Sequence, residues 1–287
     1  MSNTKYARTI FGISILALGI HHCMHDYLIF PRLPAVPFPA SLLLMGGFFY
    51  HSALTALGAA ILFSDRAKPA ALVLGIFMTV WVFFRHFPIV IADITDPAEL
   101  NAMFMGLAAA GSALIISASI PGRSEFARDF SFHKSRFAHT LGIYFFGTAM
   151  LVFGAQHLGY ASFIALLIPK WIPGNFFWAY LTGIALMASG VSILCERKSK
   201  ISARLLGCMI AAWIFLVHIP RLVEHPADHL EWNSLIQAAV VIGGALALSN
   251  ASATTGSKTI KPVSEPRPQK IKKHGRPAEP AAKRPLK

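Results

Sequence analysis

One long stretch of this sequence occurs twice, and the repetition restricts the fold more than any other feature. The segment WVFFRHFPIVIADITDPAELN at 81–101 aligns without a gap with WIFLVHIPRLVEHPADHLEWN at 213–233, at an offset of 132 residues. Tryptophan, histidine, proline, aspartate, glutamate and asparagine recur at matching places in the two segments. A fixed period of this size indicates one structural unit present in two copies.

Apolar segments make up the rest of each copy. Hydrophobic residues account for 55% of the 287 residues and charged residues for only 14%, whereas about 25% charged residues is usual in soluble domains. Each segment has about 20 residues, enough for a helix to cross ~30 Å of hydrocarbon. Helices are expected because they satisfy their own backbone hydrogen bonds in lipid. The predicted spans are 9–27, 42–63, 69–90, 98–120, 137–158, 175–195, 201–222 and 230–249.

The first span follows Lys5 and Arg8, as the apolar core of a signal peptide would. No small-residue cleavage site comes after it, and its Gly19-x-x-His22 matches Gly154-x-x-His157 at an offset of 135. We therefore expect this helix to be retained as the first of its unit. Gly19, like Gly12 before it, is expected to allow close helix packing.

The predicted fold is an all-α polytopic membrane protein with eight transmembrane helices in two four-helix repeats. An even number of spans gives both units the same orientation, which makes the repeats parallel. The expected divisions are a first unit at 1–120, a basic cytoplasmic link at 121–136, a second unit at 137–250 and a disordered basic tail at 251–287. Twelve Lys or Arg residues lie on the link side before the tail is added and four on the other. This bias predicts cytoplasmic termini and a multi-pass protein of the inner (plasma) membrane.

The formal net charge of +13 does not indicate nucleic acid as a partner. Ten Lys or Arg residues lie in the tail from Lys258 to Lys287, against two acidic residues. The tail is rich in Pro, Lys, Ala and Ser and has few large apolar residues, so it cannot bury a core. Two roles remain open for it: contact with anionic inner-leaflet lipid, or a positive charge that only fixes the topology.

Histidines at the outer ends of the helices are the strongest candidates for a site. His22 and His86 end the first and third spans of one unit, and His157 and His218 do the same in the other. If these helices are neighbours, each pair of imidazoles could hydrogen-bond a quinone carbonyl and pass on the proton that accompanies reduction. Such a pair could instead ligate a haem or another metal. A purely structural hydrogen bond to a neighbouring helix end is the third interpretation.

Three further side chains belong to the candidate site. His51 lies in the middle of the second span, where an ionisable group is unusual, and its counterpart is Gly183. It could bond to another helix or serve a cofactor or proton path. Trp81 and Trp213 lie five residues before the paired histidines. They could line a site or anchor the helices near the interface.

Pro88 and Pro220 are predicted to end the third span of each unit, because proline disfavours helical geometry in the residue before it. Asn101 and Asn233 open the fourth span. They are candidates either to cap that helix or to hydrogen-bond across helices, and they complete the set of candidate cofactor-binding residues. No metal site, and no catalytic residue, is assigned.

The segment FGAQHLGYASFIALLIPKWIPGNFFWAYLTGIALMASGVSIL at 153–194 resembles the first two helices of a DoxX-like membrane protein. The G-x-x-H, the P-x-W-x-P-G loop (Pro169, Trp171, Pro173, Gly174) and the tyrosine-bearing helix after it carry the resemblance. The first half resembles a divergent copy of the same unit, in which the sequence FPRLPAVPFPAS replaces this loop. The resemblance implies a small membrane module linked to redox complexes, since the family takes its name from a subunit of a quinone-reducing thiosulfate oxidoreductase.

The expected function is that of a quinone-linked redox subunit with outer-face histidine sites, in contact with membrane lipid and a partner redox subunit. Quinone is the first candidate ligand and haem the second. Two alternatives stay open: a non-catalytic assembly or scaffold protein, and a transporter of a small solute or lipid. Motifs of hydrolases, nucleotide-binding proteins, zincins and thioredoxin-like proteins are absent from the sequence.

Overall fold

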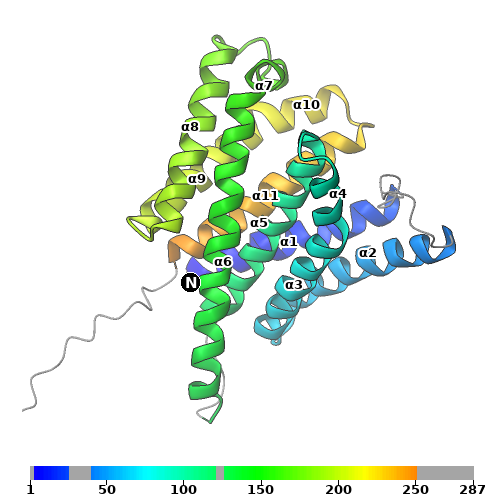
Figure 1. Cartoon of the computed structure of the whole chain (residues 1–287), viewed down its shortest axis with the longest axis vertical. Helices are drawn as coiled ribbons and strands as arrows, with labels where there is room; N and C mark the ends of the chain where they lie inside the picture. The colour runs from blue at the N-terminus through cyan, green and yellow to red at the C-terminus, as the bar shows by residue number, and fades with distance from the viewer. Residues whose placement is uncertain (1–2, 26–39, 121–125, 251–287) are drawn as a thin grey trace, which may run out of the picture. The chain divides into compact units, whose positions relative to one another are not determined.

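A computed structural model describes residues 3–25, 40–120 and 126–250, and every regular element in these ranges is helical (Figure 1). The elements are α1 (Asn3–Met24), α2 (Ala40–Phe63), α3 (Ala67–Trp81), η1 (Val82–His86), α4 (Phe87–Ala92), α5 (Pro97–Ser119), α6 (Phe126–Gly159), α7 (Ala161–Leu167), α8 (Asn175–Leu194), α9 (Ser199–Trp213), η2 (Ile214–His218), α10 (Ile219–Glu224) and α11 (His229–Asn250). The rewritten loop at 30–39 and the tail at 251–287 lie outside the described residues.

Eight helices in the described residues are long and apolar enough to cross a membrane. The chain is therefore an all-α, multi-pass integral membrane protein, as the apolar segments predicted. Two helices begin more than a turn earlier than expected. The helix α1 begins at Asn3 and includes Arg8, whose Nη2 donates a hydrogen bond to the carbonyl oxygen of Leu62 (3.2 Å) near the end of α2. The helix α6 begins at Phe126, inside the predicted link at 121–136.

The third span of each half does not end at its proline. In both halves an α-helix passes into a five-residue π-helical segment, η1 or η2, and continues through the proline to Ala92 or Glu224. The backbone N–H of Phe87 bonds to the carbonyl oxygen of Val82, and that of Ile219 to Ile214, five residues back. Pro88 and Pro220 lie in the first turn after this wide turn, where a proline fits a helix. The prediction that they end the helix was wrong for this reason.

Aspartates, not the predicted asparagines, cap the fourth helix of each half. The Oδ1 of Asp96 accepts hydrogen bonds from the backbone N–H groups of Ala98 (2.9 Å) and Glu99 (3.2 Å) at the start of α5. The Oδ1 of Asp228 accepts one from Leu230 (2.8 Å) at the start of α11. A short carboxylate side chain just before the helix can reach these N–H groups, whereas Asn101 and Asn233 lie one turn inside.

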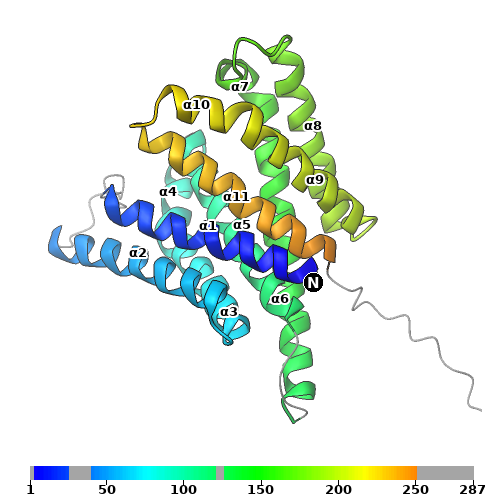
Figure 2. The same cartoon turned by 180° about the vertical axis from the view of Figure 1, so that it is seen from behind.

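Two antiparallel helix pairs join the halves, together with a contact between α5 and α11: α1 runs along α11, as Figure 2 shows, and α6 along α5. The fully buried Phe11 lies against Gly243, where an added Cβ would come within 2.7 Å of the phenylalanine Cβ. The fully buried Phe146 lies against Gly111 in the same manner, with its backbone nitrogen 2.9 Å from such a Cβ. Small residues thus allow close backbone contact at both junctions.

The same two helix pairs carry a matching side-chain hydrogen bond near their other ends. The Nε2 of His21 donates to the carbonyl oxygen of His229 (3.1 Å), and the Nε2 of Gln156 donates to that of Pro97 (3.0 Å). His21 and Gln156 stand 135 residues apart, and Pro97 and His229 stand 132 apart. The offsets seen in the sequence therefore recur in the contacts between helices.

Within each half the first two helices also pack through glycine. A Cβ at Gly19 would lie 2.5 Å from the backbone nitrogen of Thr55, and one at Gly154 would lie 2.8 Å from that of Met187. A Cβ at Gly12 would come within 3.3 Å of Leu62, so both glycines predicted to allow close packing in α1 do so. This packing brings α8 against the end of α6 that carries His157.

Candidate ligand-binding cavity

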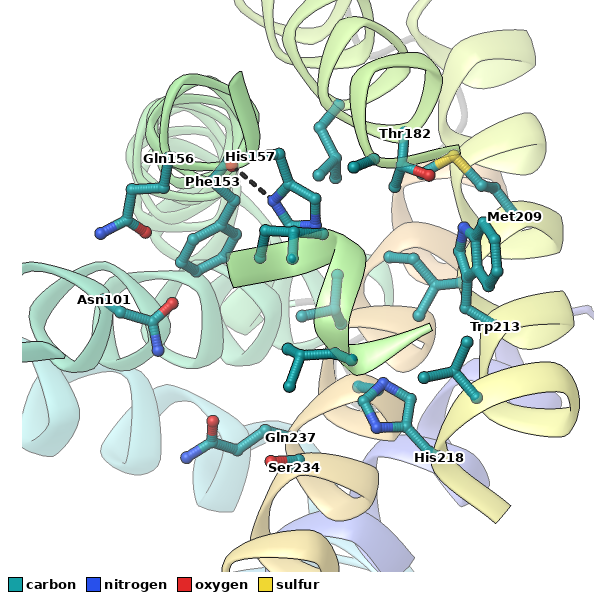
Figure 3. Close-up of a pocket in the computed structure, with 18 of the residues that line it drawn as sticks. Asn101, Phe153, Gln156, His157, Thr182, Met209, Trp213, His218, Ser234 and Gln237 are labelled. Carbon is teal, nitrogen blue, oxygen red and sulfur yellow. Dashed lines mark hydrogen bonds between the residues drawn. The ribbon is translucent and has the colours of Figure 1, made fainter. Parts of the chain in front are cut away.

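A cavity of about 320 Å³ lies between helices of both halves, and most of the side chains that line it are apolar. Its walls come from α5, α6, α7, α8, α9, η2 and α11 (Figure 3). Its polar lining side chains are Asn101, Gln156, His157, Thr182, His218, Ser234 and Gln237. An apolar hollow with a few polar groups is the usual form of a small-molecule site.

His157 enters the cavity from the last turn of α6. Its Nδ1 donates a hydrogen bond to the carbonyl oxygen of Phe153 (2.8 Å), one turn earlier on the same helix (Figure 3). Because a carbonyl can only accept, the proton of the neutral ring lies on Nδ1, and Nε2 is then an acceptor. A hydroxyl group of a ligand could donate to Nε2, and protonation of this nitrogen would turn it into a donor.

The π-helical segment η2 brings Trp213 and His218 to the same cavity. In an α-helix of 3.6 residues per turn, side chains five positions apart point about 140° away from each other. The hydrogen bonds of a π-turn span five residues, which reduces that angle. The Trp213 ring also meets the Trp178 ring edge to face, with ring centroids 5.8 Å apart at 83°. The indole is therefore held in place by a second aromatic ring.

A partly buried ion pair lies just after η2. Glu231 is buried in the first turn of α11, and its Oε2 accepts a hydrogen bond from Nε of Arg221 (3.0 Å), with a second contact between Nη2 and Oε1. Nη1 of Arg221 also donates to the carbonyl oxygen of Leu167 (3.5 Å) at the end of α7. The guanidinium thus ties α7 to α11.

The first half has a related ion pair built from other positions. The carboxylate of the buried Glu99 lies 3.7 Å from Nη1 of Arg85, which is buried in η1. Its Oε2 also accepts a hydrogen bond from Nδ1 of His86 (3.3 Å). Glu99 and Glu231 match at the offset of 132, whereas Arg85 matches Val217. Both halves therefore have the buried glutamate, but the arginine that pairs with it comes from η1 in the first half and from α10 in the second.

The remaining candidate residues of the first half form a compact cluster. The Nε2 of His22 donates to Oδ1 of Asn233 (3.1 Å), which comes from the other half. The ring of His22 meets the ring of His51 edge to face, with centroids 5.4 Å apart. The ring of Trp81 stacks on Tyr50 with centroids 4.2 Å apart and an angle of 27° between the planes.

The structure thus divides the nine candidate residues into two groups. Asn101, His157, Trp213 and His218 line one cavity, so the second predicted histidine pair shares a site. In the first half, His22 contacts His51 and Asn233, while His86 contacts Glu99. Asn233 hydrogen-bonds the first-helix histidine of the opposite half, in keeping with the cross-helix role considered from the sequence, and Asn101 shares the cavity with His157. Their participation in ligand binding stays a prediction.

Sequence reasoning missed several residues of these two groups. Tyr50, Thr182 and Gln237 were not considered, and Glu99 and Glu231 were not among the candidate residues. The offset of 132 could have pointed to the glutamates, which match within the first turn of a helix. It also pairs Tyr50 with Thr182, a change from a large ring to a small side chain.

Comparison with protein-family models, with curated proteins and with solved structures gave no match. Among the described residues, no three His, Cys, Asp or Glu side chains are grouped so that they could hold a metal ion.

Proposed function

We propose that this protein is a quinone-binding subunit of a membrane redox system, built from two parallel DoxX-like four-helix units. The cavity that joins His157, His218 and Asn101 beside Trp213 carries the proposal. A quinone headgroup is a planar ring with two carbonyl oxygens, so it needs flat apolar walls and a few hydrogen-bond donors. An apolar cavity with imidazole and amide groups in its walls meets both needs.

The proposed chemistry is binding and proton exchange at the headgroup. Reduction of a quinone to a quinol takes two electrons and two protons, one proton for each carbonyl oxygen. A partner redox subunit supplies the electrons. His157 and His218 are placed to donate to the carbonyl oxygens and to accept from the quinol hydroxyls, because imidazole changes its protonation state near neutral pH. Arg221 and Glu231 beside His218 lie toward the outer surface, where protons exchange with water.

The proposed orientation puts both termini on the cytoplasmic side of the plasma membrane, with the cavity nearer the outer face. The excess of Lys and Arg on the link side supports this arrangement. The tail at 251–287 then faces anionic inner-leaflet lipid, which attracts basic segments.

Purification in mild detergent followed by solvent extraction tests the binding of a quinone. We expect co-purified quinone and saturable binding of a short-chain benzoquinone, followed by quenching of tryptophan fluorescence. His218→Ala should raise the Kd of the quinone, and His157→Ala the Kd of the corresponding quinol, each about 2- to 10-fold, because each change removes one neutral hydrogen bond.

The matched control is His225→Ala, because His225 is exposed in the turn before α11 and does not line the cavity. Its Kd should equal that of the wild-type protein. A folded protein that neither retains nor binds quinone would contradict the proposal and favour an assembly or transport role.

A further inference from the structure

The two halves differ at the place where the second half has its cavity. The difference lies in the size of the side chains at two matching positions. Tyr50 and His51 on α2 correspond at the offset of 132 to Thr182 and Gly183 on α8. Tyr50 and His51 are buried, and the hydroxyl of Tyr50 donates to Sδ of Met78 (3.7 Å). In the second half Thr182 lines the cavity. A phenol ring therefore fills one half at a place where the other half has open volume.

The helices around these residues correspond, so the comparison is between equivalent places, although Trp178, which packs on Trp213, has the smaller Gly46 as its counterpart. Trp81 and Trp213 each end an α-helix immediately before a π-helical segment. The helices that carry Tyr50 and Thr182 pack on the first helix of their own half through Gly19 and Gly154, as described above. The Tyr50 ring lies on the Trp81 ring at 4.2 Å and 27°, an offset-stacked geometry.

Gly183 lets α8 approach the part of α6 that carries His157. A Cβ at this glycine would lie 3.0 Å from Cβ of His157 and 2.9 Å from Cδ2 of Leu158. The helices could not approach so closely with a larger residue there. In the first half the corresponding His51 lies against His22, and Leu158 is replaced by the smaller Cys23 at the offset of 135. The first half thus accommodates an imidazole on α2 where the second half packs α8 directly against His157.

We propose that the cavity binds a planar six-membered ring that stacks on Trp213 in the position that Tyr50 occupies on Trp81. Tyr50 acts as a built-in occupant that closes the first half, and the smaller Thr182 leaves the second half open. The identity of the ring as a quinone rests on the proposed function, whereas its shape and its place on Trp213 rest on the stacked Tyr50–Trp81 pair. Polar groups on the ring then face His157 and His218.

The test exchanges the side chains of Tyr50, which fills the site in the first half, and Thr182, which leaves it open in the second. Thr182→Tyr should abolish saturable binding of a short-chain benzoquinone, because the new phenol takes the place of the ligand. Tyr50→Thr should add a second binding site, whose ligand quenches Trp81. The double variant should bind one ligand, now beside Trp81 and not Trp213. Equilibrium dialysis measures the number of sites, and Trp81→Phe or Trp213→Phe backgrounds identify the quenched indole.

Matched controls place the same side chains on the exposed face of α8. Ile184→Tyr and Tyr180→Thr change exposed positions on that helix and should leave binding unchanged. Circular dichroism and gel filtration check that each variant is folded. If Thr182→Tyr does not fold, Trp213→Leu replaces it and should weaken binding about 2- to 10-fold through loss of stacking, whereas Trp213→Phe should retain most of it.

A second probe separates this inference from the proposed function. Naphthalene is planar and has no carbonyl oxygen. Binding of naphthalene but not quinone, with quenching of Trp213, would refute the quinone function and keep the stacking site. Binding of quinone that Thr182→Tyr and Trp213→Leu leave unchanged would keep the function and overturn the stacking site. Binding of neither probe to the wild-type protein would overturn both.

Discussion

Glu99 and Glu231 are the residues whose environment differs most from what their place in the sequence indicated. Both are acidic, both lie near the ends of membrane spans, and each is only 6% exposed. A buried carboxylate without a partner would be costly, so each lies against a guanidinium. The glutamate therefore joins the first turn of the fourth helix to the third helix in each half, and in the second half it also stands beside a cavity residue, His218.

Removal of Glu231 should destabilise the protein measurably. Glu231→Ala leaves the charge of Arg221 without its carboxylate and removes two charge-assisted hydrogen bonds. The expected loss is about 2 kcal/mol, below the range for fully buried pairs because Arg221 remains partly exposed. Thermal unfolding in detergent, followed by circular dichroism, measures the effect as a lower Tm.

The control for this change is Glu224→Ala, since Glu224 is exposed on the neighbouring helix α10. The double variant Arg221→Met, Glu231→Leu should recover much of the lost stability, because no unpaired charge remains. Equal Tm values for Glu231→Ala and Glu224→Ala would show that the ion pair contributes nothing.

At the scale of the helices, two features determine where the cavity residues point. The π-helical segments turn Trp213 and His218 toward one cavity, and π-helical turns are frequent at functional sites. Glycines then set the distance between neighbouring helices. The proline after each π-helical segment was visible in the sequence, but the wide turn before it was not, because a π-turn needs no characteristic residue.

Adding one methyl group at two glycines should give opposite results. In Gly58→Ala the new Cβ on α2 would lie 2.5 Å from the backbone nitrogen of Leu16 and 2.8 Å from its Cα. Backbone atoms cannot rotate away, so α1 and α2 must separate, at a cost of about 1–3 kcal/mol. In Gly207→Ala the Cβ would meet only Ala245, at an ordinary 3.6 Å. That change should be neutral or stabilise the helix by up to about 1 kcal/mol.

Unfolding of the two variants by a graded denaturing detergent compares them directly. Both replace glycine with alanine in a membrane-spanning helix, so the intrinsic helix preference is the same and only the packing differs. A loss of stability in Gly207→Ala equal to that in Gly58→Ala would mean that close helix approach is not what the glycine in α2 provides.

At the scale of the whole described unit, the antiparallel pairing of α1 with α11 brings its first and last helices together. Phe11 meets Gly243 and His21 meets His229, so the start of α1 lies beside the end of α11. An even number of spans also requires both ends to lie on one side of the membrane. The geometry agrees with the proposed common side for the termini, and the distribution of Lys and Arg predicts that this side is the cytoplasm.

Reporter fusions measure this orientation. Alkaline phosphatase is active only outside the cytoplasm, and green fluorescent protein exported through the general secretion route does not fluoresce. Fusions after residues 120 and 250 should fluoresce and lack phosphatase activity, because they follow an even number of spans. A fusion after residue 173 follows five spans and should behave in the opposite way. The reverse pattern at all three points would mean that the termini face outward.

The local features of this protein follow from its sequence for direct physical reasons. Apolar runs of about 20 residues leave a membrane helix as the only way to satisfy the backbone in lipid, so the spans were predictable to within a few residues in most cases. Among the candidate residues that the offsets of 132 and 135 singled out, His157, His218, Trp213 and Asn101 line one cavity. Composition and repeat period predict the spans and the matching positions because both are properties of the order of residues along the chain.

The contacts between side chains of different helices could not be predicted from the sequence in the same way. Three contacts depend on which helices are neighbours and how closely they approach. They join Asn233 to His22, Arg221 to Glu231, and Tyr50 to Trp81. Those contacts join residues from different helices, and they follow from helix rotation, π-turns and glycine contacts. A single sequence records which side chains are present in each half. Packing determines that Tyr50 fills one half and that the space beside Thr182 stays open in the other.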